Sequence, residues 1–91
     1  MEFEWDEAKN ESNRIKHEVD FSIVHEFDWD RSSLRQDDRR NYGEDRLIAY
    51  GPASDGQLYV IVFTPRNGRY RIITARRFGR KDHRYYEPAQ P

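Results

Sequence analysis

The sequence predicts an α+β domain in which two N-terminal helices pack on a four-stranded antiparallel meander sheet and a short helix ends the chain. Three observations support this prediction. Residues 58–63 are apolar at every position, which is typical of a central strand buried on both faces. Asn67 and Gly68 form the dipeptide that a two-residue turn prefers, so residues 70–75 return as the next strand. Helical patterns precede these strands and do not alternate with them.

The first helix follows a clear start signal. Asp6 is a suitable N-cap for a helix that begins at Glu7 and ends before Asp20. Residues 3–5, just before it, alternate apolar and acidic side chains, as a short edge strand would. Small and apolar residues recur along the helix at spacings of three and four. These residues are its predicted inward face: Trp5, Ala8, Ser12 and Ile15.

A second, shorter helix is predicted within residues 19–27 and is expected to dock on the sheet. Asp20 or Ser22 would cap its N-terminus. Its inward stripe is formed by Phe21, Ile23, Val24 and Phe27.

The other strands and the C-terminus complete a single domain over residues 1–91. Residues 46–50 are predicted as a strand, and residues 35–41 as the charged edge strand that pairs with it. A last short helix is expected over residues 80–87, followed by a disordered tail at residues 88–91, where two prolines occur.

Composition excludes several functional classes. The chain contains no cysteine, so disulfides, thiolate nucleophiles and cysteine-based metal sites are excluded. No apolar run approaches the length of a membrane-spanning helix, and the N-terminal stretch is acidic where a signal peptide is basic. A cytoplasmic protein without membrane contact is expected. No glycine-rich phosphate loop or metal-ligand spacing is present, so neither a cofactor nor a metal is expected.

Charge is distributed unevenly along the chain. Residues 1–45 contain 14 acidic and 7 basic residues, a net charge of −7, whereas residues 46–91 contain 3 acidic and 9 basic residues, a net charge of +6. Only three of the 16 basic residues are lysine. Arginine binds phosphate in a bidentate manner, so this bias favours a nucleic acid or another phosphate-bearing partner over a merely solvated surface.

Short motifs with similar spacing run through nearly the whole chain: Phe3-Glu4-Trp5-Asp6, Lys9, Asn13, Lys16-His17, Val19-Asp20-Phe21, Gly43 with Arg46, Tyr70 to Arg76, and Arg84-Tyr85-Tyr86. This set resembles the BrnT toxin family. The resemblance implies a RelE-like fold and a metal-independent endoribonuclease that acts as the toxin of a bacterial type II toxin–antitoxin module. It also implies a ribbon-helix-helix (BrnA-like) antitoxin as partner, RNA as substrate, and DNA contact only through the antitoxin. Glu18 stands where the family usually has glycine, which argues against a left-handed helix end there.

Cleavage of RNA by its own 2′-hydroxyl needs a base, a stabiliser of the phosphorane charge and a proton for the leaving 5′ oxygen. The resemblance assigns charge stabilisation to Arg46, Arg71 and Arg76. Lys9 and His17 on the first helix are the candidate proton carriers, although a histidine at a helix C-terminus is more often a cationic capping residue. The residues expected to bind RNA are Arg69, Arg77, Arg80, Lys81, Tyr85 and Tyr86, either tyrosine also being able to supply a proton or a stacking ring.

Two other functions explain the same arginines. The chain could be a non-catalytic module that binds RNA or protein, with salt-dependent binding and no cleavage products. It could also be a degenerate toxin that keeps only antitoxin binding and operon co-repression. The residues leave open which of these groups is the base and which is the acid.

Overall fold

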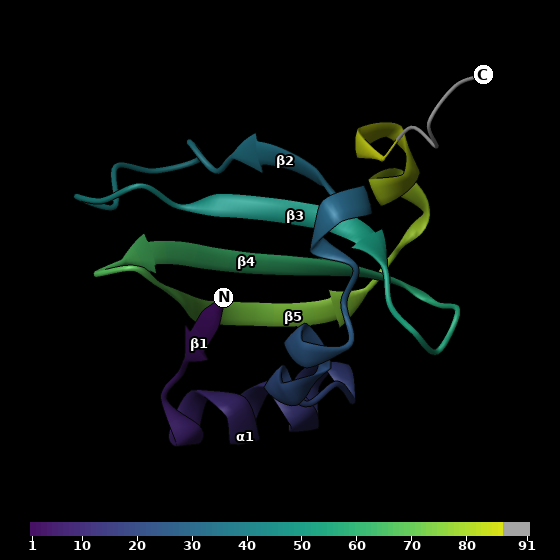
Figure 1. Ribbon diagram of the computed structural model, residues 1–91, viewed down its shortest axis with the longest axis horizontal. Coiled ribbons are helices and arrows are strands. Elements are labelled where there is room, and N and C mark those ends of the chain that lie inside the picture. Colours follow the sequence, from purple (N-terminus) through teal and green to yellow (C-terminus); the bar gives the residue numbers. More distant parts are fainter. Residues whose placement is uncertain (87–91) are drawn as a thin grey trace.

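The computed structural model describes residues 1–86. Figure 1 shows one twisted sheet, with a helix along one edge and short helical turns around its ends. The elements in chain order are β1 (Glu2–Glu4), α1 (Glu7–His17), the 3₁₀ turns η1 (Phe21–His25) and η2 (Trp29–Arg31), β2 (Ser33–Gln36), β3 (Leu47–Pro52), β4 (Leu58–Arg66), β5 (Arg69–Arg77) and the 3₁₀ turn η3 (Arg80–Tyr85).

The sheet has five strands and is mixed, so the prediction of a four-stranded antiparallel sheet is wrong. The strand order is β1-β5-β4-β3-β2, and β2 to β5 form the expected antiparallel meander. β1 adds a parallel edge beside β5, with Phe3 opposite Tyr70. Sequence alternation indicated strand character here, but a parallel pairing between segments so distant in the chain leaves no local signal.

The prediction of two N-terminal helices is also wrong, because α1 is the only α-helix within residues 1–86. Residues 21–25 form a 3₁₀ turn capped by the Asp20 carboxylate. The buried side chains Phe21, Val24 and Phe27 are spaced by three, which matches the three residues per turn of a 3₁₀ helix. The C-terminal helix expected over residues 80–87 is likewise a 3₁₀ turn, η3, and the predicted tail at residues 88–91 lies outside the described residues.

The edge strand predicted at residues 35–41 lies earlier, at Ser33–Gln36. The chain leaves the sheet at Asp37, whose carboxylate is fully buried and accepts two hydrogen bonds of 2.7 Å from the Arg39 side chain. Residues 38–46 therefore form a loop around this ion pair. The Asn67-Gly68 turn is confirmed, with both residues at positive φ.

α1 docks on β5 through polar side chains. Its predicted inward face is wrong within the helix, although Trp5, just before the helix, does pack against the apolar core. Ile15 is 76% exposed, whereas Asn10 and Asn13 are buried. The Asn13 side chain donates to the Ala75 carbonyl at 2.8 Å and accepts from the Ala75 N–H at 3.2 Å. A side-chain amide thus pairs with the edge of β5 as a neighbouring strand would, beyond the point where β1 ends.

α1 ends at Glu18 in the left-handed conformation, with φ 59° and ψ 33°, and the Glu18 N–H bonds to the Arg14 carbonyl. The helix end that favours glycine is therefore present although the residue is glutamate, and a side chain there costs about 1–2 kcal/mol.

Replacing Glu18 with glycine is expected to raise the free energy of unfolding by about 1 kcal/mol, because the left-handed strain disappears. Chemical denaturation measures this change. Ser12→Gly, at an exposed position inside α1, is the control and is expected to lower stability by a few tenths of a kcal/mol, roughly. Equal destabilisation by both glycines would contradict the strain argument.

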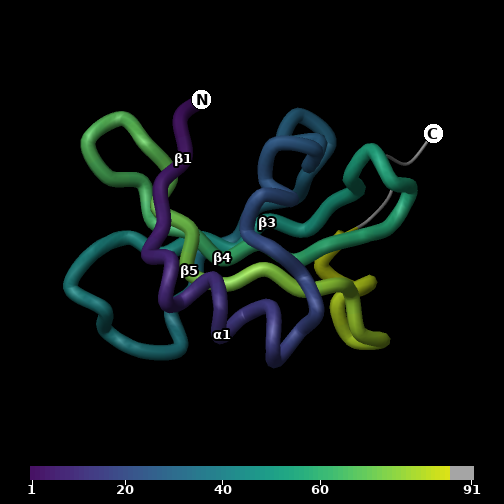
Figure 2. The backbone as a smooth tube through the Cα atoms, turned by 90° about the horizontal axis from the view of Figure 1, so that it is seen from below, coloured from purple at the N-terminus to yellow at the C-terminus, as the bar shows by residue number. Residues whose placement is uncertain are grey.

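The two faces of the sheet differ. One face, the covered face, packs Ala49, Ile61 and Phe63 against η1, η2 and the aromatic residues of the N-terminus. The other face, the open face, carries a smaller apolar cluster of Ile48, Tyr50, Val60 and Val62. Figure 2 shows η2 on one side of the sheet, and η3 with the loop between β2 and β3 on the other side.

Candidate active site

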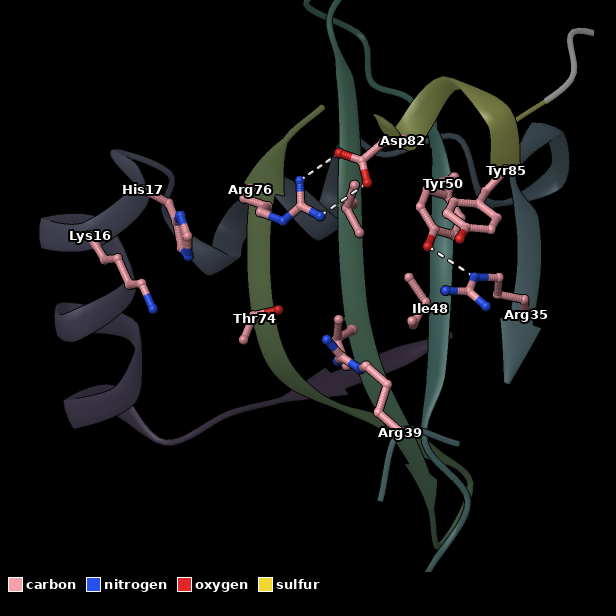
Figure 3. A pocket seen from close by; sticks show the side chains of 12 residues that line it. Lys16, His17, Arg35, Arg39, Ile48, Tyr50, Thr74, Arg76, Asp82 and Tyr85 are labelled. Carbon is pink, nitrogen blue, oxygen red and sulfur yellow. Dashed lines mark hydrogen bonds and ion pairs between the residues drawn. The ribbon is translucent and has the colours of Figure 1, made fainter. Parts of the chain in front are cut away.

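The open face contains a cavity of about 350 Å³, which we call the central groove (Figure 3). Its floor is apolar and consists of Ile48, Val60 and Val62. Its walls come from the C-terminus of α1, from β5, β3 and β2, from the loop after β2 and from η3. The charged and polar wall residues are Lys16, His17, Arg35, Arg39, Tyr50, Thr74, Arg76, Asp82 and Tyr85.

A β-bulge directs β5 toward this groove. The register with β4 shifts between Val62, which faces Thr74, and Phe63, which faces Ile72, so Ile73 is the extra residue. Ile72 and Ala75 consequently both belong to the covered-face core. Strict alternation would place Arg76 on the same side as Ile72, whereas the bulge turns it onto the open face.

Arg76 is held in a fixed position by Asp82. Its Nη1 lies 2.7 Å from Asp82 Oδ2 and its Nη2 lies 3.1 Å from Asp82 Oδ1. Asp82 Oδ2 also accepts a hydrogen bond of 2.6 Å from the Gly79 N–H. Burial disfavours the Asp82 carboxylate, but the bonds from Arg76 and Gly79 outweigh it and lower the pKa of Asp82. The pair with Asp82 raises the pKa of Arg76, so both groups remain charged.

His17 is the last residue of α1 and lies beside Arg76, where its side chain lines the groove (Figure 3). Burial lowers the pKa of His17, and the neighbouring charges of Lys16 and Arg76 lower it further. The cationic imidazolium expected at a helix C-terminus is therefore disfavoured here. A neutral imidazole at pH 7 can accept a proton.

An aromatic wall closes the groove on the side of β2 and η3. The Arg35 guanidinium lies over the Tyr85 ring, 4.0 Å from its centre, and Arg35 Nε donates to the Tyr50 hydroxyl at 3.1 Å. The ring centres of Tyr50 and Tyr85 are 5.2 Å apart. The groove thus combines an apolar floor, cations and neighbouring aromatic rings, which together suit a nucleotide.

Comparison with known proteins identifies the family. Residues 5–82 match the family model described as the ribonuclease toxin BrnT of type II toxin–antitoxin systems. The chain belongs to the BrnT family. The resemblance noted in the sequence is therefore confirmed.

One solved structure has a fold similar to that of the present chain. The crystal structure of the Brucella abortus ribonuclease toxin BrnT, at 1.1 Å resolution, superposes with a TM-score of 0.72 and 23% sequence identity. The match covers 88% of the present chain and 99% of the Brucella chain, so the two share a fold over almost their whole length. A comparison with curated proteins finds no significant match.

Two further observations concern residues 1–86 of this BrnT family member. None of the helices described there is long and apolar enough to cross a membrane. No group of three or more histidine, cysteine or acidic side chains gathers there as a metal-ligand set.

The BrnT fold brings together only some of the predicted site residues. His17, Arg76 and Tyr85 meet in the central groove. Arg71 lies outside it and pairs with Glu4 on β1 at 3.3 Å. Lys9 lines a smaller hollow beside His17, and Arg46 lines a pocket at the far end of the sheet.

The predicted RNA-binding residues are also dispersed. Arg69 pairs with Glu2 and Glu4, and Arg77 donates to the Gln57 side chain. Arg80 and Lys81 are exposed on η3. Tyr86 packs against the apolar cluster of the open face.

Sequence reasoning missed several groove residues, among them Lys16, Arg35, Arg39, Thr74 and Asp82. One signal for Asp82 was present, since it is the only acid among eight basic residues between Arg66 and Arg84. A single carboxylate in such a basic segment indicates an ion pair with one of the arginines, here Arg76.

Proposed function

We propose that this BrnT family member is an active endoribonuclease that cleaves RNA without a metal, through attack of the 2′-hydroxyl on the adjacent phosphodiester. The observation that carries the proposal is the arrangement of two neighbouring groups in the central groove, one at the end of α1 and one on β5, the strand that α1 packs against. His17 has a lowered pKa and is available as a base, and Arg76 is held rigidly by Asp82. Such a pair can remove a proton and stabilise the negative charge that follows.

Each step of the reaction has a group to perform it. His17 accepts the 2′ proton as the 2′ oxygen bonds to phosphorus. Arg76 and Lys16 stabilise the charge on the phosphorane oxygens. Tyr85, across the groove from His17, donates a proton as the bond from phosphorus to the 5′ oxygen breaks. The products are a 2′,3′-cyclic phosphate and a 5′-hydroxyl.

The proposal extends to the partner. The family belongs to type II toxin–antitoxin systems, so an antitoxin protein neutralises the toxin. We assign a ribbon-helix-helix, BrnA-like protein to this role, with DNA bound only through it. Cleavage of cytoplasmic messenger RNA would then inhibit translation whenever the antitoxin is lacking.

The test is cleavage of single-stranded RNA by the purified chain in excess EDTA. Cleavage that survives EDTA and stops when the antitoxin is added is the expected result. Salt-dependent RNA binding without products, together with normal growth of a host that expresses the chain alone, would favour the non-catalytic module instead.

A further inference from the structure

The central groove is one part of a longer depression across the open face. On the α1 side it adjoins a hollow of about 200 Å³, the helix-side pocket, which shares Lys16, His17 and Thr74 with the groove and also contains Lys9. On the other side Arg39 lines both the groove and a third cavity of about 350 Å³, the outer pocket. The central groove therefore adjoins both of the other cavities through shared lining residues.

The outer pocket is built from Arg39, Arg40, Tyr42 and Arg46. The Arg46 guanidinium lies 4.0 Å from the centre of the Tyr42 ring, and its Nε, 3.6 Å from Asp37 Oδ2, is buried without a hydrogen-bond partner. The fully buried Asp37 carboxylate therefore orders this pocket without satisfying Arg46. Hydrogen bonds from Arg39 overcome the burial and lower the pKa of Asp37 to about 2, so the carboxylate is ionised at neutral pH.

Free positive charge lies at both ends of the depression. Asp82 neutralises Arg76 in the centre, and Asp37 neutralises Arg39. Lys9 at the α1 end and Arg40 in the outer pocket have no ion-pair partner among residues 1–86. Unpaired cations that flank a catalytic centre are where the neighbouring phosphates of a strand would bind.

We infer that these three cavities form a track for one extended RNA strand, an inference that rests on the proposed ribonuclease function. The scissile phosphate lies in the central groove, between His17 and Arg76. A phosphate on one side binds Lys9, and a phosphate on the other side binds Arg40 and Arg46 in the outer pocket, where Tyr42 stacks behind the guanidinium. Arg46 and Lys9 thus bind flanking phosphates and do not act on the bond that breaks.

The substrate class is single-stranded RNA. The floor of the central groove is apolar, and Arg35 and Tyr85 stack beside it, so an unpaired base can be buried and stacked there. A duplex keeps its bases paired and stacked inside the helix, so no base face is free to cover that floor.

The test uses 2′-O-methyl RNA, which cannot be cleaved, so binding is measured independently of catalysis. A trinucleotide spans only the central groove, whereas a dodecanucleotide spans the whole track. For single strands each phosphate contact contributes about 0.7 to the slope of log K against log salt. Arg40→Gln is expected to reduce this slope by about 0.7 for the dodecanucleotide and to leave it unchanged for the trinucleotide. Lys9→Gln is expected to behave in the same way.

Arg31→Gln is the matched control, because Arg31 is an exposed arginine on η2, on the other side of the sheet. It is expected to leave both slopes unchanged. The track would be overturned if Arg40→Gln and the wild type had equal salt slopes on the dodecanucleotide. It would also be overturned if Arg31→Gln reduced that slope as much as Arg40→Gln does. If the track is confirmed by these slopes and unmodified RNA is not cleaved, the proposed catalysis fails while the binding inference stands.

Discussion

Replacing His17 with glutamine is expected to lower kcat for RNA cleavage by about 10²–10⁴-fold, the range for loss of a general base. Glutamine keeps a polar side chain of similar reach but cannot accept the 2′ proton. The fold should tolerate the change, since His17 lies on a wall of the groove and makes no hydrogen bond that α1 requires. The measurement is single-turnover cleavage of a labelled RNA oligonucleotide.

The pH profile separates a base from a merely structural residue. Because burial, Lys16 and Arg76 lower the pKa of His17 below 6.5, the wild-type rate should rise with pH through that lowered pKa and be level at neutrality. This rising limb should vanish in His17→Gln. The control is His25→Gln, an exposed histidine that packs against Phe3, whose rate and profile should match the wild type. A His17→Gln rate within threefold of the wild type would refute the base assignment.

Replacing Arg76 with alanine is expected to reduce kcat by about 10²–10³-fold, as for loss of one donor to a developing oxyanion. A second effect complicates this variant. Asp82 would be left nearly buried without its cationic partner, which destabilises the fold by about 1–3 kcal/mol. Activity measurements alone would not separate the two effects.

A paired substitution keeps the Arg76 prediction testable. Arg76→Ala combined with Asp82→Asn removes the uncompensated charge, so the free energy of unfolding should return toward the wild-type value while activity stays low. Asp82→Asn alone leaves the arginine charge but loosens its position, and should lower kcat less than Arg76→Ala does. Recovery of full cleavage in the double variant would show that Arg76 acts only on stability.

The strands that depend on local signals were predicted well from the sequence. The apolar run in β4 and the Asn67-Gly68 turn fix the central hairpin, because composition and turn geometry act over a few residues. A short edge strand was expected near β1, but its place in the sheet was not predicted, since its partner β5 lies more than sixty residues away and the pairing is parallel. Long-range pairings of this kind have no pattern within either segment.

The groove was harder to predict than the fold. After the bulge at Ile73, the residues of β5 point to the opposite faces from those that strict alternation predicts. Alternation therefore assigns Arg76 to the wrong face of the sheet. The buried face of α1 carries Asn10 and Asn13, and an apolar-periodicity argument therefore chooses the opposite face. The structure nevertheless places in the central groove both Arg76, which the family resemblance suggested, and His17, which was a candidate proton carrier.

The most direct test of the proposed mechanism is the chemistry of the cleaved ends. The main cleavage site in an RNA oligonucleotide is mapped in EDTA, and the nucleotide that carries the attacking 2′-hydroxyl is then replaced by its 2′-deoxy form. Attack by the 2′-hydroxyl predicts 2′,3′-cyclic phosphate and 5′-hydroxyl ends on the unmodified RNA and no cleavage at the deoxy position. Ends with a 3′-hydroxyl and a 5′-phosphate, or cleavage that persists at the deoxy position, would contradict it.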